Sequence, residues 1–311
     1  MRPRILPLSR GSSHKNELMD VKPLCRIAMI CLLSMTSACA QAGFALINVP
    51  SRLGDMVELS GLAYGTEPSQ QLNIYRPAGS EGQNLDVIVF FYGGRWTFGD
   101  KDDYRFVGKT FTDRNFIVVI PDVRKYPAVR FPVFIQDGAK ALAWVHDNIA
   151  RYHGNPARIH VAGHSSGAHI GALLAADPRY LADEGKDRSS LILDFAGLAG
   201  PYAFTPDEPD LIEMFGPPAN YPAMQATTFI DGRQPPMLLL YGDADDTVRI
   251  ANLEKLVARI RTTGGTVHAE IYRNIGHVGI ASALSWFNPS RVPVVDDMVK
   301  FFRLPGRHAG K

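Results

Sequence analysis

The chain has 311 residues, of which 46% are hydrophobic and 21% charged, a composition typical of a globular protein with a substantial core. Its formal net charge of +2 is too small to indicate a nucleic-acid partner. All three cysteines lie within the first 40 residues, which excludes disulfides, a cysteine nucleophile and thiolate metal ligands from the rest of the chain.

The first 40 residues are expected to be an export signal. They carry six basic and two acidic side chains, which leaves a formal charge of −2 on the rest of the chain. Their apolar run, Ile27 to Ala40, is shorter than the ~20 residues that span a bilayer and suits a secretory signal. Ala38-Cys39-Ala40 fits the small-residue rule for cleavage after Ala40.

Two other interpretations of this segment stay open. In the first, Cys39 carries the lipid of a bacterial lipoprotein; in the second, the apolar run packs as a helix on the folded body. The expected domains are the signal, 1–40, and one folded domain, 41–311. We expect an exported protein, periplasmic or secreted, that meets a membrane only through the signal or a lipid on Cys39.

From about residue 57 the chain alternates between predicted strands and helices. Apolar runs and alternation predict strands near 57–65, 71–77, 85–94, 116–123, 158–163, 191–200, 235–243 and 267–277. Apolar residues at helical spacing predict helices over 133–154, 166–178, 248–265 and 292–304.

This alternation predicts the fold class. Continuous apolar strands between helices indicate an α/β fold with a mostly parallel central sheet and helices on both faces. The first two strands, separated by a turn region, are expected to be antiparallel. The proline-rich stretch 202–236 has no clear periodicity, and we expect it to form a small irregular cap over the carboxyl edge of the sheet.

Two serines lie where a strand meets a helix, in the sequence RIHVAGHSSGAHIGALLAADP. A sharp turn there crowds the positions two before and two after its central residue, which favours glycine at both. Gly163 and Gly167 satisfy this for Ser165 but not for Ser166. Such a turn exposes the Ser165 hydroxyl and places the Ser166 N–H at a helix start, where donors are unpaired. The alternative is a serine pair that only caps the helix.

A nucleophilic serine needs a base and an acid that orients the base. Among the nine histidines, only His277 follows a strand at the edge where Ser165 is expected. The preceding strand leads into three aspartates, Asp243, Asp245 and Asp246. The order Ser, Asp, His along the chain is that of the α/β-hydrolase fold.

Several other polar residues are expected to be structural. His160 is expected to be a satisfied core histidine, and packing is the favoured role for His169. His164 adjoins Ser165 and is poorly placed to fold back on its hydroxyl. Asp122 and Arg124 are expected to form a buried pair.

The segments FFYGGRWTFGDK, VAGHSSGAH, LLLYGDADDTV and GH occur in this order over about 85–280. They resemble the esterase and lipase superfamily of α/β-hydrolases, near its small carboxylesterase and kynurenine-formamidase-like branch. The resemblance implies Ser165 as nucleophile, His277 as base and one of the three aspartates as acid.

The same resemblance bears on the details of the site. Its spacing favours Asp245, three residues after the strand-ending glycine; the neighbouring aspartates would face solvent or cap a helix starting near residue 247. It implies an oxyanion hole made by the backbone N–H groups of Gly94, Arg95 and Ser166. Where this branch usually has histidine, the chain has Tyr92, which leaves the backbone donors intact but alters the side-chain hydrogen bonds of the loop.

Tyr92, Trp96, Tyr202 and Phe204 are candidate substrate-pocket residues, although each also suits a core. The expected function is cleavage of small carboxylic esters through an acyl-enzyme, with no cofactor or metal; the oligomeric state stays open. An aryl formamidase or other amide hydrolase is the first alternative, and a non-catalytic binding lipoprotein on a hydrolase scaffold is the second. A peptidase is disfavoured because no propeller or other large gating domain is visible in the sequence.

Overall fold

The computed structural model describes residues 43–52 and 54–304, so the expected export signal lies outside the described residues. Backbone contacts divide the chain into Met1–Gly43 and Phe44–Lys311, and all the strands belong to the second unit. Within the described ranges, we find no helix with the length and apolar character that crossing a membrane requires.

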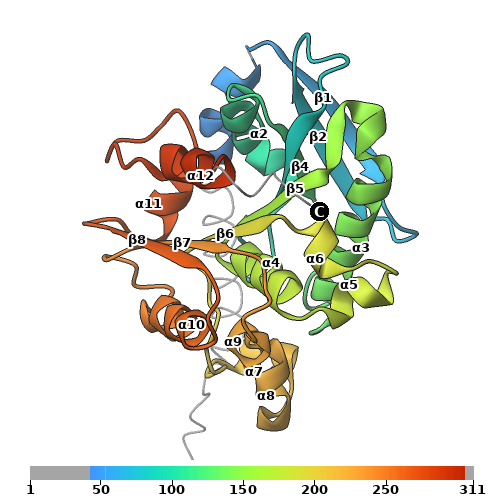
Figure 1. Ribbon diagram of the computed structural model, residues 1–311. Helices are drawn as coiled ribbons and strands as arrows, with labels where there is room; N and C mark the ends of the chain where they lie inside the picture. The colour runs from blue at the N-terminus through green and yellow to red at the C-terminus, as the bar shows by residue number, and fades with distance from the viewer. Residues whose placement is uncertain (1–42, 53, 305–311) are drawn as a thin grey trace, which may run out of the picture. The chain divides into compact units, whose positions relative to one another are not determined.

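An eight-stranded sheet forms the centre of this unit, in the order β1-β2-β4-β3-β5-β6-β7-β8 (Figure 1). β1 pairs antiparallel with β2 and β2 with β4, whereas every other neighbouring pair is parallel. The predicted fold class, with its antiparallel start, is therefore confirmed. The strands are β1 (Met56–Ala63), β2 (Gln71–Pro77), β3 (Leu85–Phe91), β4 (Ile117–Pro121), β5 (Gly154–His164), β6 (Asp194–Leu198), β7 (Met237–Gly242) and β8 (Val267–Tyr272).

Helices cover both faces of the sheet. On one face α2, α11 and α12 pack on alternate strand residues such as Ile88 and Phe90. On the other face α3, α4 and α10 pack on the intervening residues, such as Val87 and Val89. These helices are α2 (Arg105–Thr112), α3 (Val133–Asn148), α4 (Ser166–Ala176), α10 (Ala251–Thr262), α11 (His277–Ser282) and α12 (Val294–Phe302).

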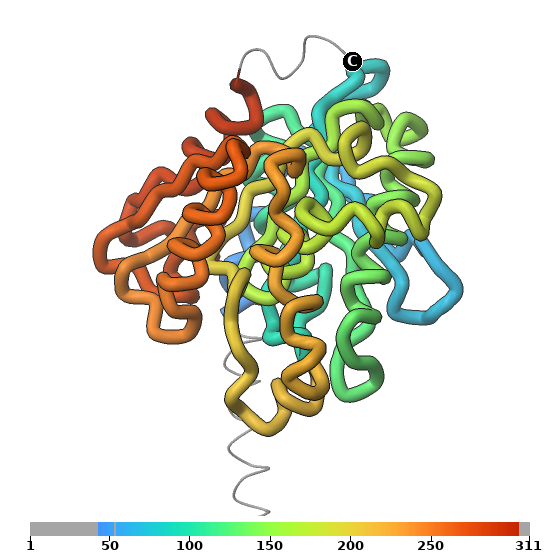
Figure 2. The backbone as a smooth tube through the Cα atoms, turned by 60° about the horizontal axis from the view of Figure 1, so that its bottom comes forward, coloured from blue at the N-terminus to red at the C-terminus, as the bar shows by residue number. Residues whose placement is uncertain are grey.

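The proline-rich stretch forms short helices rather than an irregular cap. They are α7 (Pro209–Phe215), α8 (Tyr221–Met224) and α9 (Ala226–Phe229), with a 3-10 turn over Pro218–Asn220. Proline lacks the N–H that a helix interior needs, so no long helix forms in this stretch. In Figure 2 this stretch projects from the body. The N–H of Phe131, in the loop before α3, donates to the carbonyl of Met214 in α7 at 3.0 Å and so connects the two segments.

The remaining elements are short. They are α5 (Arg179–Asp183), α6 (Arg188–Leu191) and 3-10 turns over Pro50–Arg52, Lys101–Tyr104 and Ile149–Tyr152.

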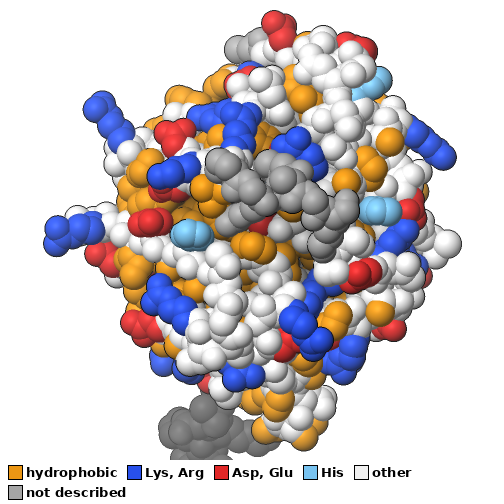
Figure 3. All heavy atoms as spheres, in the orientation of Figure 1, with side chains coloured by type: hydrophobic (Ala, Val, Ile, Leu, Met, Phe, Trp, Pro, Cys, Tyr) orange, Lys and Arg blue, Asp and Glu red, His pale blue; other side chains and the backbone are white. Residues whose placement is uncertain are grey.

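On the face of the molecule shown in Figure 3, basic and acidic side chains are interspersed, and the visible part has no single basic patch.

Candidate active site

Ser165 occupies a strained turn between β5 and α4. Its φ of 54° and ψ of −123° lie in a region that costs a non-glycine residue free energy. A Cβ on Gly163 would lie 2.6 Å from the Gly167 backbone, and one on Gly167 would lie 2.1 Å from the Phe91 carbonyl oxygen. Both glycines are therefore required by close backbone contacts, and the turn they permit leaves Ser165 partly exposed.

Three predicted side chains meet at the carboxyl edge of the sheet. His277, which begins α11 after β8, places its Nε2 2.8 Å from the Ser165 Oγ. Its Nδ1 lies 2.8 Å from Oδ2 of Asp245, in the loop after β7. The Asp245 side chain is 2% exposed and that of His277 is 11% exposed. The structure thus brings Ser165, His277 and Asp245 into one hydrogen-bonded chain.

Hydrogen bonds keep the Asp245 carboxylate charged. Burial alone would raise the pKa of Asp245, but bonds from His277 and from the N–H groups of Val248 and Thr247 lower it below its usual value. Those two N–H groups donate to Oδ1 at 2.8 and 2.9 Å. A charged acceptor at Oδ2 requires Nδ1 of His277 to carry its proton, which leaves Nε2 free to accept the Ser165 proton.

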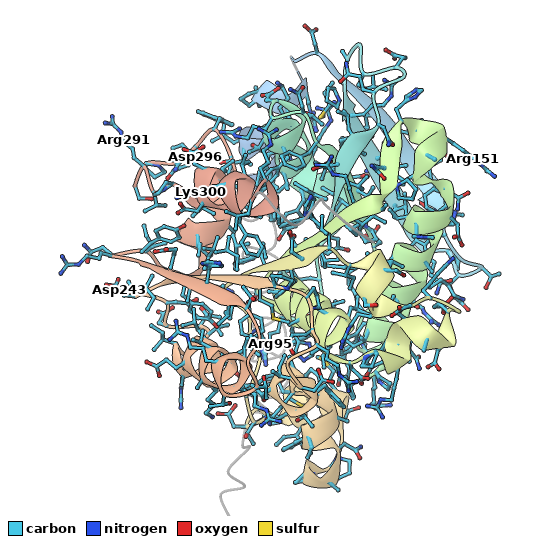
Figure 4. All side chains as sticks on the ribbon, in the orientation of Figure 1. Arg95, Arg151, Asp243, Arg291, Asp296 and Lys300 are labelled. Carbon is cyan, nitrogen blue, oxygen red and sulfur yellow. The ribbon has the colours of Figure 1, made fainter. Side chains whose placement is uncertain are left out.

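The neighbouring aspartates do not reach His277. Asp243 is exposed and accepts the N–H of Asn274, and Figure 4 shows it at the edge of the molecule. Asp246 is also exposed, with its Oδ1 3.4 Å from the Thr247 hydroxyl. Both therefore face solvent, which is one of the two roles expected for them. The other role, capping a helix that starts near residue 247, is wrong, because α10 begins only at Ala251 and its first turn receives no side-chain cap.

The predicted oxyanion donors come from two segments. Gly94 and Arg95 follow β3 with φ values of 147° and 53°, and Ser166 is the first residue of α4. A Cβ on Gly94 would lie 2.0 Å from the Phe98 carbonyl oxygen, so glycine is needed there. Within the described residues, none of the three backbone N–H groups donates a hydrogen bond, so all three remain available to a ligand.

The Arg95 side chain fixes this loop from outside. Its Nη2 lies 2.8 Å from a Glu208 carboxylate oxygen and 3.0 Å from one of Asp210. Both carboxylates belong to the start of α7, and Figure 4 shows Arg95 beside these short helices. The Arg95 side chain therefore connects the loop to the 202–236 stretch.

The Tyr92 side chain makes structural contacts around the loop that follows β3. It is 7% exposed, its hydroxyl donates to a carboxylate oxygen of Asp122, and its ring stacks on Tyr104 with centroids 5.1 Å apart. Asp122 also accepts the backbone N–H of Lys101 at 3.0 Å. Tyr92 therefore supplies the loop's side-chain hydrogen bond itself and does not offer its hydroxyl to a substrate.

The expected pair of Asp122 and Arg124 is wrong. Arg124 instead makes a two-pronged contact with Asp137 of α3, with Nη2 at 2.7 Å and Nε at 2.9 Å from its oxygens. β4 ends at Pro121, so both residues lie beyond the strand, where its side-chain alternation no longer applies. Asp122 turns toward Tyr92, and Arg124 turns toward the buried carboxylate of α3.

The other pocket candidates separate into two groups. Trp96 and Phe204 come together, stacked at 5.7 Å, and Trp96 also contacts Phe215 edge-on at 5.0 Å. Tyr202, in contrast, has no exposed surface and packs edge-on against Phe195 in the core. Assigning Tyr202 to the pocket is therefore wrong, since its ring lies in the hydrophobic core on the face of the sheet covered by α3, α4 and α10.

Three histidines outside the triad are buried. The Nδ1 of His160 lies 2.8 Å from Oδ1 of Asp194, so this ring nitrogen has the hydrogen-bond partner expected for a buried core histidine. His169 donates through Nε2 to the Met224 carbonyl at 2.7 Å. His164 contacts His277, a role that its position in the sequence did not predict. Across the described residues, no group of three or more side chains is arranged to bind a metal ion.

Comparisons with known proteins agree with this geometry. Residues 136–302, more than half of the chain, match the prolyl oligopeptidase family, and residues 72–199 match the BD-FAE family. A probable isoprenylcysteine alpha-carbonyl methylesterase of Arabidopsis thaliana is 32% identical over 45% of this chain and 30% of its own length. Esterase LipQ of Mycobacterium tuberculosis is 27% identical over 70% of this chain and 57% of its own length.

The chain thus spans less than two thirds of these curated relatives. Among solved structures, esterase B from Lactobacillus Rhamnosis superposes with a TM-score of 0.70 at 18% identity, covering 86% of this chain and 94% of that one. At that identity the likeness concerns the fold alone. The chain belongs to the α/β-hydrolase superfamily and, within it, to the prolyl oligopeptidase family.

Proposed function

We propose that the chain is a serine hydrolase that cleaves small carboxylic esters through a covalent acyl-enzyme. The observation that carries this proposal is the hydrogen-bonded chain from Ser165 through His277 to Asp245. Free backbone donors beside the hydroxyl and the esterase names of the relatives above support it. The match covers less than two thirds of each relative's own length, so their activities do not transfer directly to this chain. The proposed activity therefore rests on the geometry of the site.

In the first half of the proposed reaction, the Ser165 Oγ attacks the ester carbonyl while His277 Nε2 takes its proton. The Asp245 carboxylate stabilises the imidazolium without taking a proton. The carbonyl oxygen becomes an oxyanion that accepts hydrogen bonds from the N–H groups of Gly94, Arg95 and Ser166. His277 then protonates the leaving alcohol oxygen, and the acyl group stays on Oγ.

In the second half, a water molecule replaces the alcohol. His277 takes a proton from the water as its oxygen attacks the acyl carbonyl, and the same N–H groups bind the second oxyanion. Collapse releases the carboxylic acid and returns the proton to Ser165. These steps need no group beyond the chain and water.

The primary test combines hydrolysis of p-nitrophenyl acetate with labelling by a fluorophosphonate probe. The wild type is expected to do both, and Ser165→Ala neither. Ser60→Ala, a matched change on the edge strand β1, should leave both unchanged, because Ser60 is exposed and, among the described residues, its hydroxyl bonds to Glu58 of the same strand. A wild type that folds but neither turns over nor labels would favour the non-catalytic binding protein.

A second test separates ester from amide substrates at the same site. We expect p-nitrophenyl esters to be cleaved with a larger kcat/KM than an aryl formamide or a prolyl p-nitroanilide. The prolyl arm is included because of the family match at residues 136–302. Preference for either amide would replace the ester assignment while keeping the Ser165 mechanism.

We also propose that residues 1–40 direct export, from the basic flank and short apolar run of the sequence. The mature protein in the cell envelope should begin at Gln41 or at lipidated Cys39, which intact mass distinguishes. Recovery of only a full-length cytoplasmic chain that begins at Met1 would contradict both versions.

A further inference from the structure

His164 contacts the general base although it plays no part in the proton transfers described above. It is the last residue of β5 and directly precedes Ser165. Its Nε2 lies 3.1 Å from the backbone carbonyl oxygen of His277, and the two imidazole centroids are 4.8 Å apart. The nucleophile's neighbour in sequence is therefore the base's neighbour in space.

The protonation state of His164 follows from its surroundings. Burial, followed by the proximity of His277, lowers the pKa of His164 to about 3, so the ring is neutral. A carbonyl only accepts, so the single ring proton is on Nε2 and is donated to His277. Within the described residues its Nδ1 has no hydrogen-bond partner. The charged or titratable groups that act on it are His277 and Asp245.

The ring has little room to move. Its residue is 6% exposed, and a Cβ on Gly93 would lie 2.7 Å from its Nδ1, so the oxyanion loop confines that side. The Ser165 N–H is fixed by the Leu198 carbonyl at 2.9 Å, which anchors the end of β5. On the other side, α11 starts at His277 with Gly276 as its N-cap and no side-chain cap. His164 therefore connects a fixed strand end to an uncapped helix start.

We propose that His164 is a positioning residue of the triad: its Nε2–H bond and ring contact fix the His277 backbone and thereby the separation of Ser165 Oγ from His277 Nε2. It acts through His277 and touches no reacting atom. The inference rests on the proposed function. Displacing a reacting group by about 1 Å can cost on the order of a hundredfold in rate, so such a contact has a measurable effect.

The test compares two variants of equal side-chain length. In His164→Gln the amide nitrogen replaces Nε2 as a donor to the His277 carbonyl, whereas His164→Met has a similar shape and no donor. We expect kcat on p-nitrophenyl acetate to be about 10- to 100-fold lower for Met than for Gln, with KM differing by less than about twofold. Equal kcat values, or a difference confined to KM, would overturn the proposal.

A matched control uses the same two substitutions at His169. That residue is fully buried and also donates to a backbone carbonyl, of Met224, but it does not contact His277. Its ring packs edge-on against Trp96 of the candidate pocket at 5.1 Å. His169→Gln and His169→Met should therefore differ in Tm and in KM, with equal kcat. A kcat difference as large as the one at position 164 would mean that buried hydrogen bonds in general, rather than this contact, control the rate.

A wild-type measurement covers the case in which His164→Met does not fold. Long-range ¹H–¹⁵N spectra should show His164 neutral with its proton on Nε2 between about pH 5 and 8. A proton on Nδ1, or protonation of the ring in that range, would overturn the proposal, because neither state matches the contact described. This readout needs no activity, so it separates failure of the positioning role from failure of the proposed esterase function.

Discussion

Replacing Asp245 by asparagine tests the assignment of the acid most directly. In the wild type, Oδ1 accepts two backbone N–H groups and Oδ2 accepts the Nδ1–H of His277. The asparagine oxygen is expected to stay with the two N–H groups, which places the amide NH₂ against Nδ1. Because that NH₂ donates, Nδ1 must become the acceptor, and the histidine proton moves to Nε2, opposite Ser165.

The size of the effect follows from this change of tautomer. With a proton on Nε2, His277 cannot accept the Ser165 proton, and the charge that stabilises the imidazolium is also lost. We expect kcat to fall by about 10⁴, the scale seen when a triad acid is neutralised. The loss of a charge-assisted hydrogen bond should cost about 1.5–3 kcal/mol in the free energy of unfolding, which leaves the protein folded.

The stabilisation has a defined pH dependence. Because the pKa of Asp245 is lowered in the folded state, its contribution is present above the unfolded pKa and is lost as pH falls through the folded pKa. The wild type should therefore lose stability relative to Asp245→Asn on acidification. If the wild type instead became more stable relative to Asp245→Asn at low pH, the hydrogen-bond arrangement described here would be contradicted.

The assay measures kcat on p-nitrophenyl acetate and Tm for three variants, Asp243→Asn, Asp245→Asn and Asp246→Asn. Asp246→Asn is the matched control, since its side chain is exposed and makes only a 3.4 Å contact with Thr247. Its free energy of unfolding should stay within about 0.5 kcal/mol of the wild type, and its kcat should be unchanged. A well-folded but inactive Asp246→Asn, beside an active Asp245→Asn, would refute the assignment.

Three further predictions concern the turn, the core and the pocket. Gly167→Ala should abolish activity and destabilise the fold by more than about 3 kcal/mol, because its Cβ would lie 2.1 Å from the Phe91 carbonyl oxygen; a stable, active variant would contradict this. Burial alone lowers the pKa of His160, but Asp194 and a second carboxylate raise it to about 9, so the stabilisation present below pH 6.5 should be lost as pH rises through 9. Urea unfolding at several pH values tests this, and a flat profile would disprove it. Acetyl and butyryl esters should be cleaved faster than long-chain esters, because Trp96 is only 7% exposed and its packing on Phe204 and Phe215 leaves little room for a long acyl chain. Faster turnover of long-chain esters would contradict this prediction.

The sequence by itself determined the features that depend on neighbours along the chain. Apolar runs identified the central strands, because burial on both faces requires apolar side chains at successive strand positions. Alternation of apolar and polar residues identified the edge strands β1 and β8, which are only partly buried. Gly163 and Gly167 identified the sharp turn at Ser165, since the crowding that demands glycine acts within two residues. The spacing of the resemblance also singled out Asp245, the aspartate that the structure brings to His277.

Only the tertiary structure decided which distant residues meet. The sequence paired Asp122 with Arg124, but the sheet and α3 bring Asp137 to the arginine. Tyr202 turned inward to the core, and His164 reached the carbonyl of a residue 113 positions later. Such contacts depend on strand order and helix placement, which bring distant segments together. Local patterns record which backbone shape a segment adopts and which face it buries, but not the partner that this face meets.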